Sequence, residues 1–351
     1  MNDIQAKLKE KIITLCSVMS VSGFEKRSDK AIRELYGKDF DEIRTDAVGN
    51  RILIKRSKKE NAPLCLVDAH FDEVGMMVTE ILDGGFLRLT NVGGISLAIL
   101  QAADVVVYGE RAIRGVIIST PPHLRSGDDE NLTEMKELLV DTGYSKEELL
   151  ELSPIGTPVG FAPVYTELLG DQIAGKGFDD KSCGACAAYG IMMADRNELA
   201  GDVYLLLSSR EEVGLVGART GAFAIDPDYA IVLDVNFAYT PDTKKEETLI
   251  LGQGPSVSYS ALTDYKLTRD IIALAKEKEI KLQTVAEASN TGTNGNVIGL
   301  TRAGVPSAVL SLPLKSMHTY SEVISVCDAM ELSKLVLAIV CDKRIGEEFS
   351  R

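Results

Sequence analysis

Short apolar runs alternate with helix-like segments near both ends of the chain. Four runs of four or five apolar residues stand between segments where apolar residues recur every three or four positions. They cover residues 64–67, 203–207, 229–233 and 308–312. Runs of this length between helices are typical of strands buried in a parallel or mixed sheet. The pattern predicts an α/β fold with a mixed central sheet flanked by helices.

The middle of the chain has a different pattern. Four short β-rich segments lie at 75–79, 86–90, 104–108 and 115–119, and glycine-rich turns such as Asp83-Gly84-Gly85 and Gly93-Gly94 separate them. Short strands with tight turns indicate a small all-β unit. Its later part, residues 128–152, is acidic and is predicted to be helical and solvated. We therefore expect a small β-barrel-like unit inserted into the α/β domain.

The first 20 residues form either an amphipathic helix or a signal peptide. Lysines precede the apolar stretch 12–21, as in a secretory signal, but Asp3 and Glu10 interrupt the basic region. Ile4, Leu8 and Ile12 recur at helical spacing, which favours an amphipathic helix.

Composition narrows the class of protein. The 351 residues fit about two domains, and 38 basic against 52 acidic residues give a net charge of −14. A chain this acidic lacks the basic footprint of nucleic-acid or anionic-membrane binders, so neither partner is expected. No apolar run approaches the length of a membrane span.

Six cysteines are too sparse for a disulfide scaffold, and we expect them to be reduced in a cytoplasmic protein. Cys183-Gly-Ala-Cys186 has the spacing of a zinc or redox pair. A structural zinc site needs a second pair, which the sequence lacks. Core packing at the start of an alanine-rich helix is the favoured interpretation.

Acidic and histidine residues follow the predicted strands. His70 and Asp72 follow the first run, Glu211 and Glu212 the second, Asp234 the third and His318 the fourth, while Asp179 lies in a glycine-rich turn. In open α/β sheets, ligands bind at the carboxyl ends of strands. Imidazoles and carboxylates without thiolates suit catalytic Zn²⁺, Co²⁺ or Mn²⁺.

Each of these residues also has an ordinary interpretation. A single histidine usually only makes structural hydrogen bonds, and adjacent glutamates usually lie on a solvated face. Asp179-Asp180 could cap a helix, and His123 is expected to be a turn or contact residue. Spacing alone therefore leaves the metal site a hypothesis.

The motifs together resemble a known family. In order, they are Ser22-Gly-Phe-Glu25, Asp68-Ala-His70-Phe-Asp72-Glu73-Val-Gly75, Gly175-Lys-Gly-Phe-Asp179-Asp180, Glu211-Glu212-Val-Gly214-Leu215, Leu233-Asp234 and Met317-His318. Over essentially the whole chain, the sequence resembles the dinuclear metalloaminopeptidases of the glutamyl and deblocking aminopeptidase group. These are the tetrahedral aminopeptidases, some of which are labelled endoglucanase or cellulase M.

The resemblance implies two divalent metal ions per chain, Zn²⁺ or Co²⁺ before Mn²⁺. One ion would be held by His70 and Asp234, and the other by Glu212 and His318, with Asp179 bridging them. Two further residues have implied catalytic roles: Glu211 as general base, and Asp72, whose carboxylate would fix the ring and tautomer of His70.

The resemblance also implies an organisation and an activity. Residues 1–73 and 164–351 would form the catalytic domain, and residues 74–163 an inserted dimerisation domain that helps to build a dodecamer. The substrates would be short peptides with a free N-terminus. A metal-dependent deacylase or amidase, a glycanase and a catalytically silent peptide-binding shell are alternatives.

Three positions depart from the family pattern. Lys181 stands where many relatives have arginine, Asn294 where many have aspartate, and Ser321-Glu322 alters the usual motif after the last histidine. None of these is an expected ligand. Lys315 and Arg302 are the basic residues considered for a pocket that accepts acidic side chains, although surface positions are the ordinary interpretation.

Overall fold

A computed structural model describes residues 3–120, 134–288 and 290–350. Its helices are α1 Asp3–Ser17, α2 Asp29–Tyr36, α3 Lys146–Leu152, α4 Phe178–Met193, α5 Val216–Ile225, α6 Tyr265–Glu277, α7 Gly295–Ile298, α8 Val326–Cys341 and α9 Lys343–Glu348. In this part of the chain, no helix is long and apolar enough to span a bilayer.

The central sheet has eight strands, in the order β1-β2-β12-β3-β13-β16-β14-β15. Their bounds are β1 Glu42–Thr45, β2 Arg51–Lys55, β3 Leu64–His70, β12 Asp202–Ser208, β13 Tyr229–Phe237, β14 Ser256–Ser260, β15 Gln283–Glu287 and β16 Ser307–Leu314. The four predicted apolar runs lie in β3, β12, β13 and β16, which are neighbours and mutually parallel. The mixed α/β fold predicted from these runs is confirmed.

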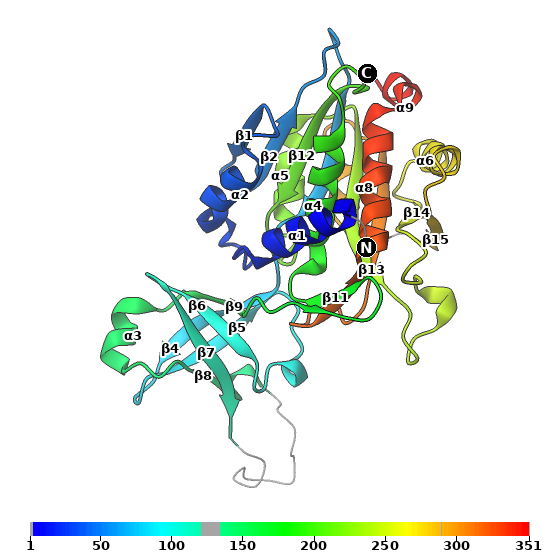
Figure 1. Ribbon diagram of the computed structural model, residues 1–351. Helices are drawn as coiled ribbons and strands as arrows, with labels where there is room; N and C mark the ends of the chain where they lie inside the picture. The colour runs from blue at the N-terminus through cyan, green and yellow to red at the C-terminus, as the bar shows by residue number, and fades with distance from the viewer. Residues whose placement is uncertain (1–2, 121–133, 289, 351) are drawn as a thin grey trace.

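Helices cover both faces of this sheet (Figure 1). One buried cluster contains side chains of α1, α4, α6 and α8, and another, on the opposite face, contains those of α5 and α7. In α1, Leu8, Ile12 and Leu15 are fully buried, as the helical spacing predicts. Cys183 and Cys186 are buried in α4 as free thiols, which confirms their place in the core.

A closed six-stranded barrel forms the second lobe, at the lower left of Figure 1. In chain order, its strands are β4 Gly75–Ile81, β5 Phe86–Val92, β6 Asp104–Tyr108, β7 Ala112–Ser119, β8 Leu138–Asp141 and β9 Pro158–Phe161. The predicted inserted barrel is thus confirmed. The stretch 128–152 differs from the prediction, because helix α3 covers only its end and β8 lies before it.

Residues 138–141 form a strand because Leu138 and Val140 alternate inward, and both are fully buried in the barrel core. A capping box at Ser145 then starts α3, since the Ser145 hydroxyl accepts from the Glu148 N–H and the Glu148 carboxylate accepts from the Ser145 N–H. His123 lies outside the described residues, as does the start of the stretch 128–152.

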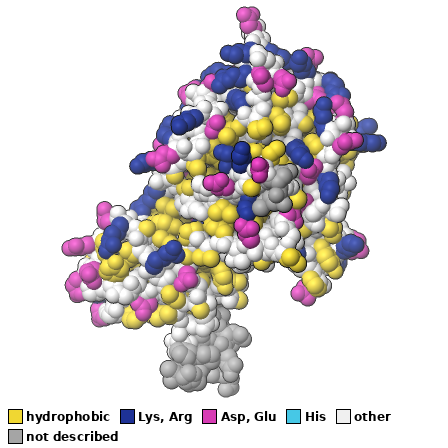
Figure 2. Space-filling model, viewed as in Figure 1, with side chains coloured by type: hydrophobic (Ala, Val, Ile, Leu, Met, Phe, Trp, Pro, Cys, Tyr) yellow, Lys and Arg dark blue, Asp and Glu magenta, His cyan; other side chains and the backbone are white. Residues whose placement is uncertain are grey.

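A small sheet of β10 Thr166–Glu167, β11 Gln172–Gly175 and β17 Glu322–Ser325 lies below the central sheet in Figure 1. On the face drawn in Figure 2, basic side chains are interspersed with acidic ones, and apolar surface gathers where the two lobes meet. This face has no continuous basic stripe of the kind that binds polyanions.

The contact between α4 and α8 depends on a glycine. A Cβ atom added to Gly190 would lie 2.4 Å from the main-chain oxygen of Ser333. Gly190→Ala is therefore expected to lower the free energy of unfolding by about 1–3 kcal/mol through overpacking, although alanine is the better helix former. Urea unfolding measures the loss. Met193→Ala, at the exposed end of the same helix, is the control, with an expected change below about 0.5 kcal/mol. An unfolding midpoint for Gly190→Ala at or above that of the wild type would contradict the prediction.

Candidate metal centre and active site

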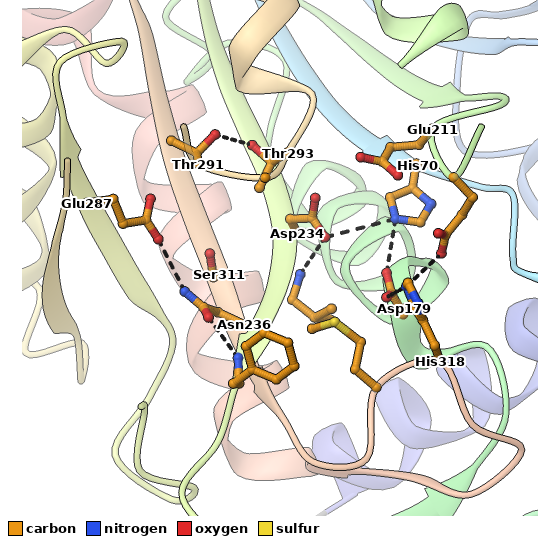
Figure 3. Close-up of a pocket in the computed structure, with 15 residues that line it drawn as sticks. His70, Asp179, Glu211, Asp234, Asn236, Glu287, Thr291, Thr293, Ser311 and His318 are labelled. Atoms are coloured by element: carbon orange, nitrogen blue, oxygen red, sulfur yellow. Dashed lines mark hydrogen bonds and ion pairs between the residues drawn. The ribbon is translucent and has the colours of Figure 1, made fainter. Parts of the chain in front are cut away.

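Six of the seven predicted site side chains face one cavity of about 290 Å³ (Figure 3). The cavity lies at the carboxyl edge of the parallel strands, because His70 ends β3 and Asp234 lies near the end of β13. Glu211 and Glu212 follow β12. Asp179 lies in the first turn of α4, and His318 follows β16. The cavity-lining set is His70, Asp179, Glu211, Glu212, Asp234 and His318.

Asp179 stands between the two histidines. Its Oδ1 lies 3.0 Å from His70 Nε2, and its Oδ2 lies 3.3 Å from His318 Nε2. Asp234 Oδ1 is 3.9 Å from His70 Nε2, while Glu212 Oε1 is 3.2 Å from His318 Nε2. The structure therefore gathers two three-residue groups that share Asp179, and in each group the candidate ligand atoms lie within 4.8 Å of one another.

Burial and mutual charge shift the pKa values of these groups. Burial raises the pKa of Asp234 well above its usual value, and the charges of Asp179 and Glu211 raise it further. Burial also acts to raise the pKa of Asp179, but hydrogen bonds to His318 and His70 outweigh it, so that this pKa is lowered. Hydrogen bonds to Asp179 and Glu212 raise the pKa of His318 to about 11.

Glu211 is enclosed beside these groups. Burial raises its pKa to about 7; the charge of His70 acts to lower it, and the charge of Glu212 acts to raise it. A carboxylate taken from water among other carboxylates favours the protonated form. Glu211 is therefore a group that can hold or release a proton near neutral pH.

Asp72 makes contacts that differ from the expected ones. The group that contacts His70 Nδ1 is the main-chain oxygen of Asp72, at 2.9 Å, while the nearest carboxylate oxygen is 3.8 Å away. The carboxylate instead accepts the N–H groups of Glu211, at 2.9 Å, and Glu212, at 3.2 Å, and the hydroxyl of Ser22. The Asp72 carboxylate thus holds the Glu211–Glu212 turn in place. Asp72 lies two residues beyond His70, the last residue of strand β3.

Glu322 is a site residue whose role the sequence did not indicate. Its side chain is buried, and its two oxygens accept the main-chain N–H groups of Phe178, Asp179 and His318. One carboxylate therefore joins the segments that carry Asp179 and His318. The only sequence signal was its position four residues after His318, in the altered motif.

Asn294 does not line the cavity. Its side-chain amide donates to Asp68 Oδ2 at 2.8 Å and to Ser208 Oγ at 2.9 Å, and all three residues are buried. Asp68 and Ser208 belong to the neighbouring strands β3 and β12. Asn294 therefore joins the start of α7 to the strands that position His70 and Glu211.

Lys181 follows Asp179 by two residues, but its side chain contacts other parts of the molecule. It is buried and donates to the main-chain oxygens of Cys16 and Val18, and it lies 3.2 Å from Glu73. The lysine thus anchors α4 to the end of α1.

The basic residues considered for substrate recognition lie elsewhere. Arg302 stacks on the ring of Phe223 and donates to its main-chain oxygen, and Lys315 pairs through its main chain with Val323. Neither lines the cavity, and no described lining residue is a lysine or an arginine.

The donor set suits divalent metal ions. Four carboxylates face two imidazoles in a largely buried cavity, which leaves negative charge without a neighbouring lysine or arginine to balance it. Burying such charge is unfavourable unless a cation compensates it. Imidazole and carboxylate ligands match Zn²⁺ and related ions, and the shared Asp179 fits a paired site.

Known proteins of the same kind resemble this chain over nearly its whole length. The chain is 36% identical to the lysyl aminopeptidase of Pyrococcus furiosus, over 91% of this chain and 93% of that protein. A TET aminopeptidase structure from a Thaumarchaeota archaeon superimposes with a TM-score of 0.90, at 30% identity, over 98% of this chain and 99% of that one.

A second solved structure is the TET1 peptidase of Pyrococcus horikoshii, which can assemble into a tetrahedron or a large octahedral shell. It is 30% identical, with a TM-score of 0.83, over 95% of this chain and 99% of that one. The family model of the M42 glutamyl aminopeptidases matches residues 49–335, a range that contains all seven predicted site residues. On the evidence of this match and of the identity to the lysyl aminopeptidase, this chain belongs to the M42 glutamyl aminopeptidase family.

Proposed function

We propose that this protein is a metal-dependent aminopeptidase that removes N-terminal residues from short peptides. The observation that carries the proposal is the position of Asp179, whose two oxygens face His70 and His318, with Glu211 lining the same cavity. One divalent ion would be held by His70, Asp179 and Asp234, and the second by Asp179, Glu212 and His318.

The chain's own residues would divide the work as follows. When bound, the two ions supply Lewis-acid polarisation of the scissile carbonyl and lower the pKa of a water molecule. Glu211 accepts a proton from the attacking water and passes it to the nitrogen of the leaving amine. Asp72 keeps Glu211 in place by accepting its main-chain N–H, and Glu322 keeps Asp179 and His318 in register.

Removal of metal is expected to abolish activity. Protein stripped with a chelator should release no amino acid, and Zn²⁺, Co²⁺ or Mn²⁺, added back separately, should restore release. Leucine, glutamate, lysine and alanine peptides, each with a free and an N-acetylated terminus, form the assay panel. Release from free termini only is the expected result. Absence of turnover with two ions bound per chain would contradict the proposal.

The same panel separates the alternatives. A deacylase or amidase would act on the acetylated peptides, and a silent shell would bind peptides without product. A glycanase needs two opposed carboxylates and no metal, so it would release reducing sugar from a cellulosic polymer even with chelator present.

The assembly forms a second part of the proposal. Residues 1–73 and 164–351 would act as the catalytic domain, and residues 74–163 as a dimerisation domain from which a cytoplasmic dodecamer is built. Val164, Leu168 and Leu169 are exposed apolar residues beside the barrel boundary, as expected of a contact surface. Light scattering after size exclusion measures the mass; a monomer at micromolar concentration would contradict this part.

A further inference from the structure

The cavity contains one acidic residue that the metal centre does not use. Glu287 ends β15, the edge strand of the central sheet, and lies across the cavity from His70 and Glu211 in Figure 3. Strand β15 lies three places from β13 in the sheet. Glu287 therefore stands apart from the two groups of candidate metal ligands. Glu287 is therefore available for contact with another part of a substrate.

Glu287 is held in place by uncharged groups. Its Oε1 accepts from the side-chain amide of Asn236 at 3.3 Å, and the orientation of that amide is fixed because Asn236 Oδ1 accepts the N–H of Phe237 at 2.7 Å. The hydroxyl of the buried Ser258 also acts on the carboxylate and lowers the pKa of Glu287, against the effect of burial, which raises it. In the part of the chain that the structure describes, no lysine, arginine or histidine forms an ion pair with Glu287.

The walls between Glu287 and the metal centre suit an aliphatic chain. Val235, Phe237 and Met317 line the cavity together with the small polar residues Thr291, Thr293 and Ser311. Lysine and arginine carry a flexible methylene stem that packs on apolar surface and ends in a cation. A cavity with an apolar wall and one uncompensated carboxylate at its far side matches this shape and charge.

We infer that Glu287 selects substrates with a basic N-terminal residue, lysine or arginine, by pairing with the cationic end of its side chain. This inference rests on the proposed function, because it needs the free amine and the scissile bond to lie at the metal centre beside Glu211. A neutral side chain would leave the carboxylate unpaired, and a glutamate side chain would be repelled by it.

Glu287→Gln tests the inference, since glutamine keeps the shape and removes the charge. On the metal-loaded protein, kcat/KM is measured for Lys-, Arg-, Leu- and Glu-Ala-Ala peptides. We expect the wild type to favour Lys and Arg over Leu, and Glu287→Gln to lose about 10- to 100-fold on Lys and Arg only. Comparison of Lys with Arg shows which cation fits better. Glu246→Gln, an exposed surface change, is the matched control and should retain the wild-type preference.

Binding provides a second measurement that does not need turnover. Calorimetry with lysinamide and leucinamide is expected to show tighter lysinamide binding by the wild type, and loss of this difference in Glu287→Gln. This result in a protein without turnover would support the pocket while contradicting the aminopeptidase. Equal use or binding of Lys and Leu by the wild type, or a lysine preference that survives Glu287→Gln, would overturn the inference.

Discussion

Glu211→Gln is expected to lower kcat by about 10²- to 10⁴-fold while both metal ions stay bound. Glutamine fills the same space but cannot accept the proton of the attacking water. The main-chain N–H of residue 211 still donates to Asp72, so the turn that carries Glu212 keeps its position. Metal content by mass spectrometry and kcat on a free peptide are the two measurements, with Glu246→Gln as control.

The combination of results separates two roles for Glu211, because it also lies in a group with His70 and Glu212 whose candidate ligand atoms are within 4.8 Å of one another. Loss of an ion together with activity would make Glu211 a ligand rather than the base. Wild-type turnover with two ions bound would remove it from the mechanism altogether.

Asp179→Asn is expected to lower the metal content of the protein more than Glu211→Gln does. The side chain places one oxygen 3.0 Å from His70 Nε2 and the other 3.3 Å from His318 Nε2, whereas asparagine offers a single oxygen and an NH₂ group. Bound metal should fall from two ions per chain to one or fewer. Activity should fall by about 10³-fold or more, because several kcal/mol of transition-state stabilisation come from the metal ions.

The control for this change is Asp242→Asn, an exposed aspartate in a loop that does not line the cavity. Circular dichroism of both variants checks that the fold is retained. If Asp179→Asn kept two ions with unchanged affinity, the shared-ligand role of Asp179 would have to be abandoned.

The sequence predicted four of the eight strands of the central sheet, β3, β12, β13 and β16, because these strands are buried on both faces. Runs such as residues 229–233 have no polar residue to mark a solvent side, so their length and composition were sufficient. Strand β8 was missed because it has only four residues and lies in an acidic stretch. Strand β8 pairs with β5 and β7, which lie earlier in the chain, so the composition of residues 138–141 alone does not predict the pairing.

For the candidate site, the sequence predicted which residues lie at the sheet edge but not which contacts hold them. Strand ends place His70 and Asp234 at one sheet edge, and this follows from topology alone. The contacts of Asp72 with the 211–212 turn depend on the path of the main chain after β3. The orientation of Glu287 depends on Asn236 in β13, which lies 51 residues earlier in the sequence, before strand β14 and helix α6. Contacts of this kind are set by packing, for which periodicity gives no signal.

The insertion of the barrel has a consequence for the order in which the chain can acquire structure. Strand β3 ends at His70, and the barrel begins at Gly75, so every barrel strand is synthesised before β12 begins at Asp202. The barrel contains all its own partners, whereas β3 waits for β12 and β13 to arrive. During synthesis, the barrel can therefore fold on the ribosome while strand β3 remains unpaired. Until β12 and β13 emerge, both edges of the apolar strand β3 lack their partners, and unpaired strand edges of this kind promote aggregation.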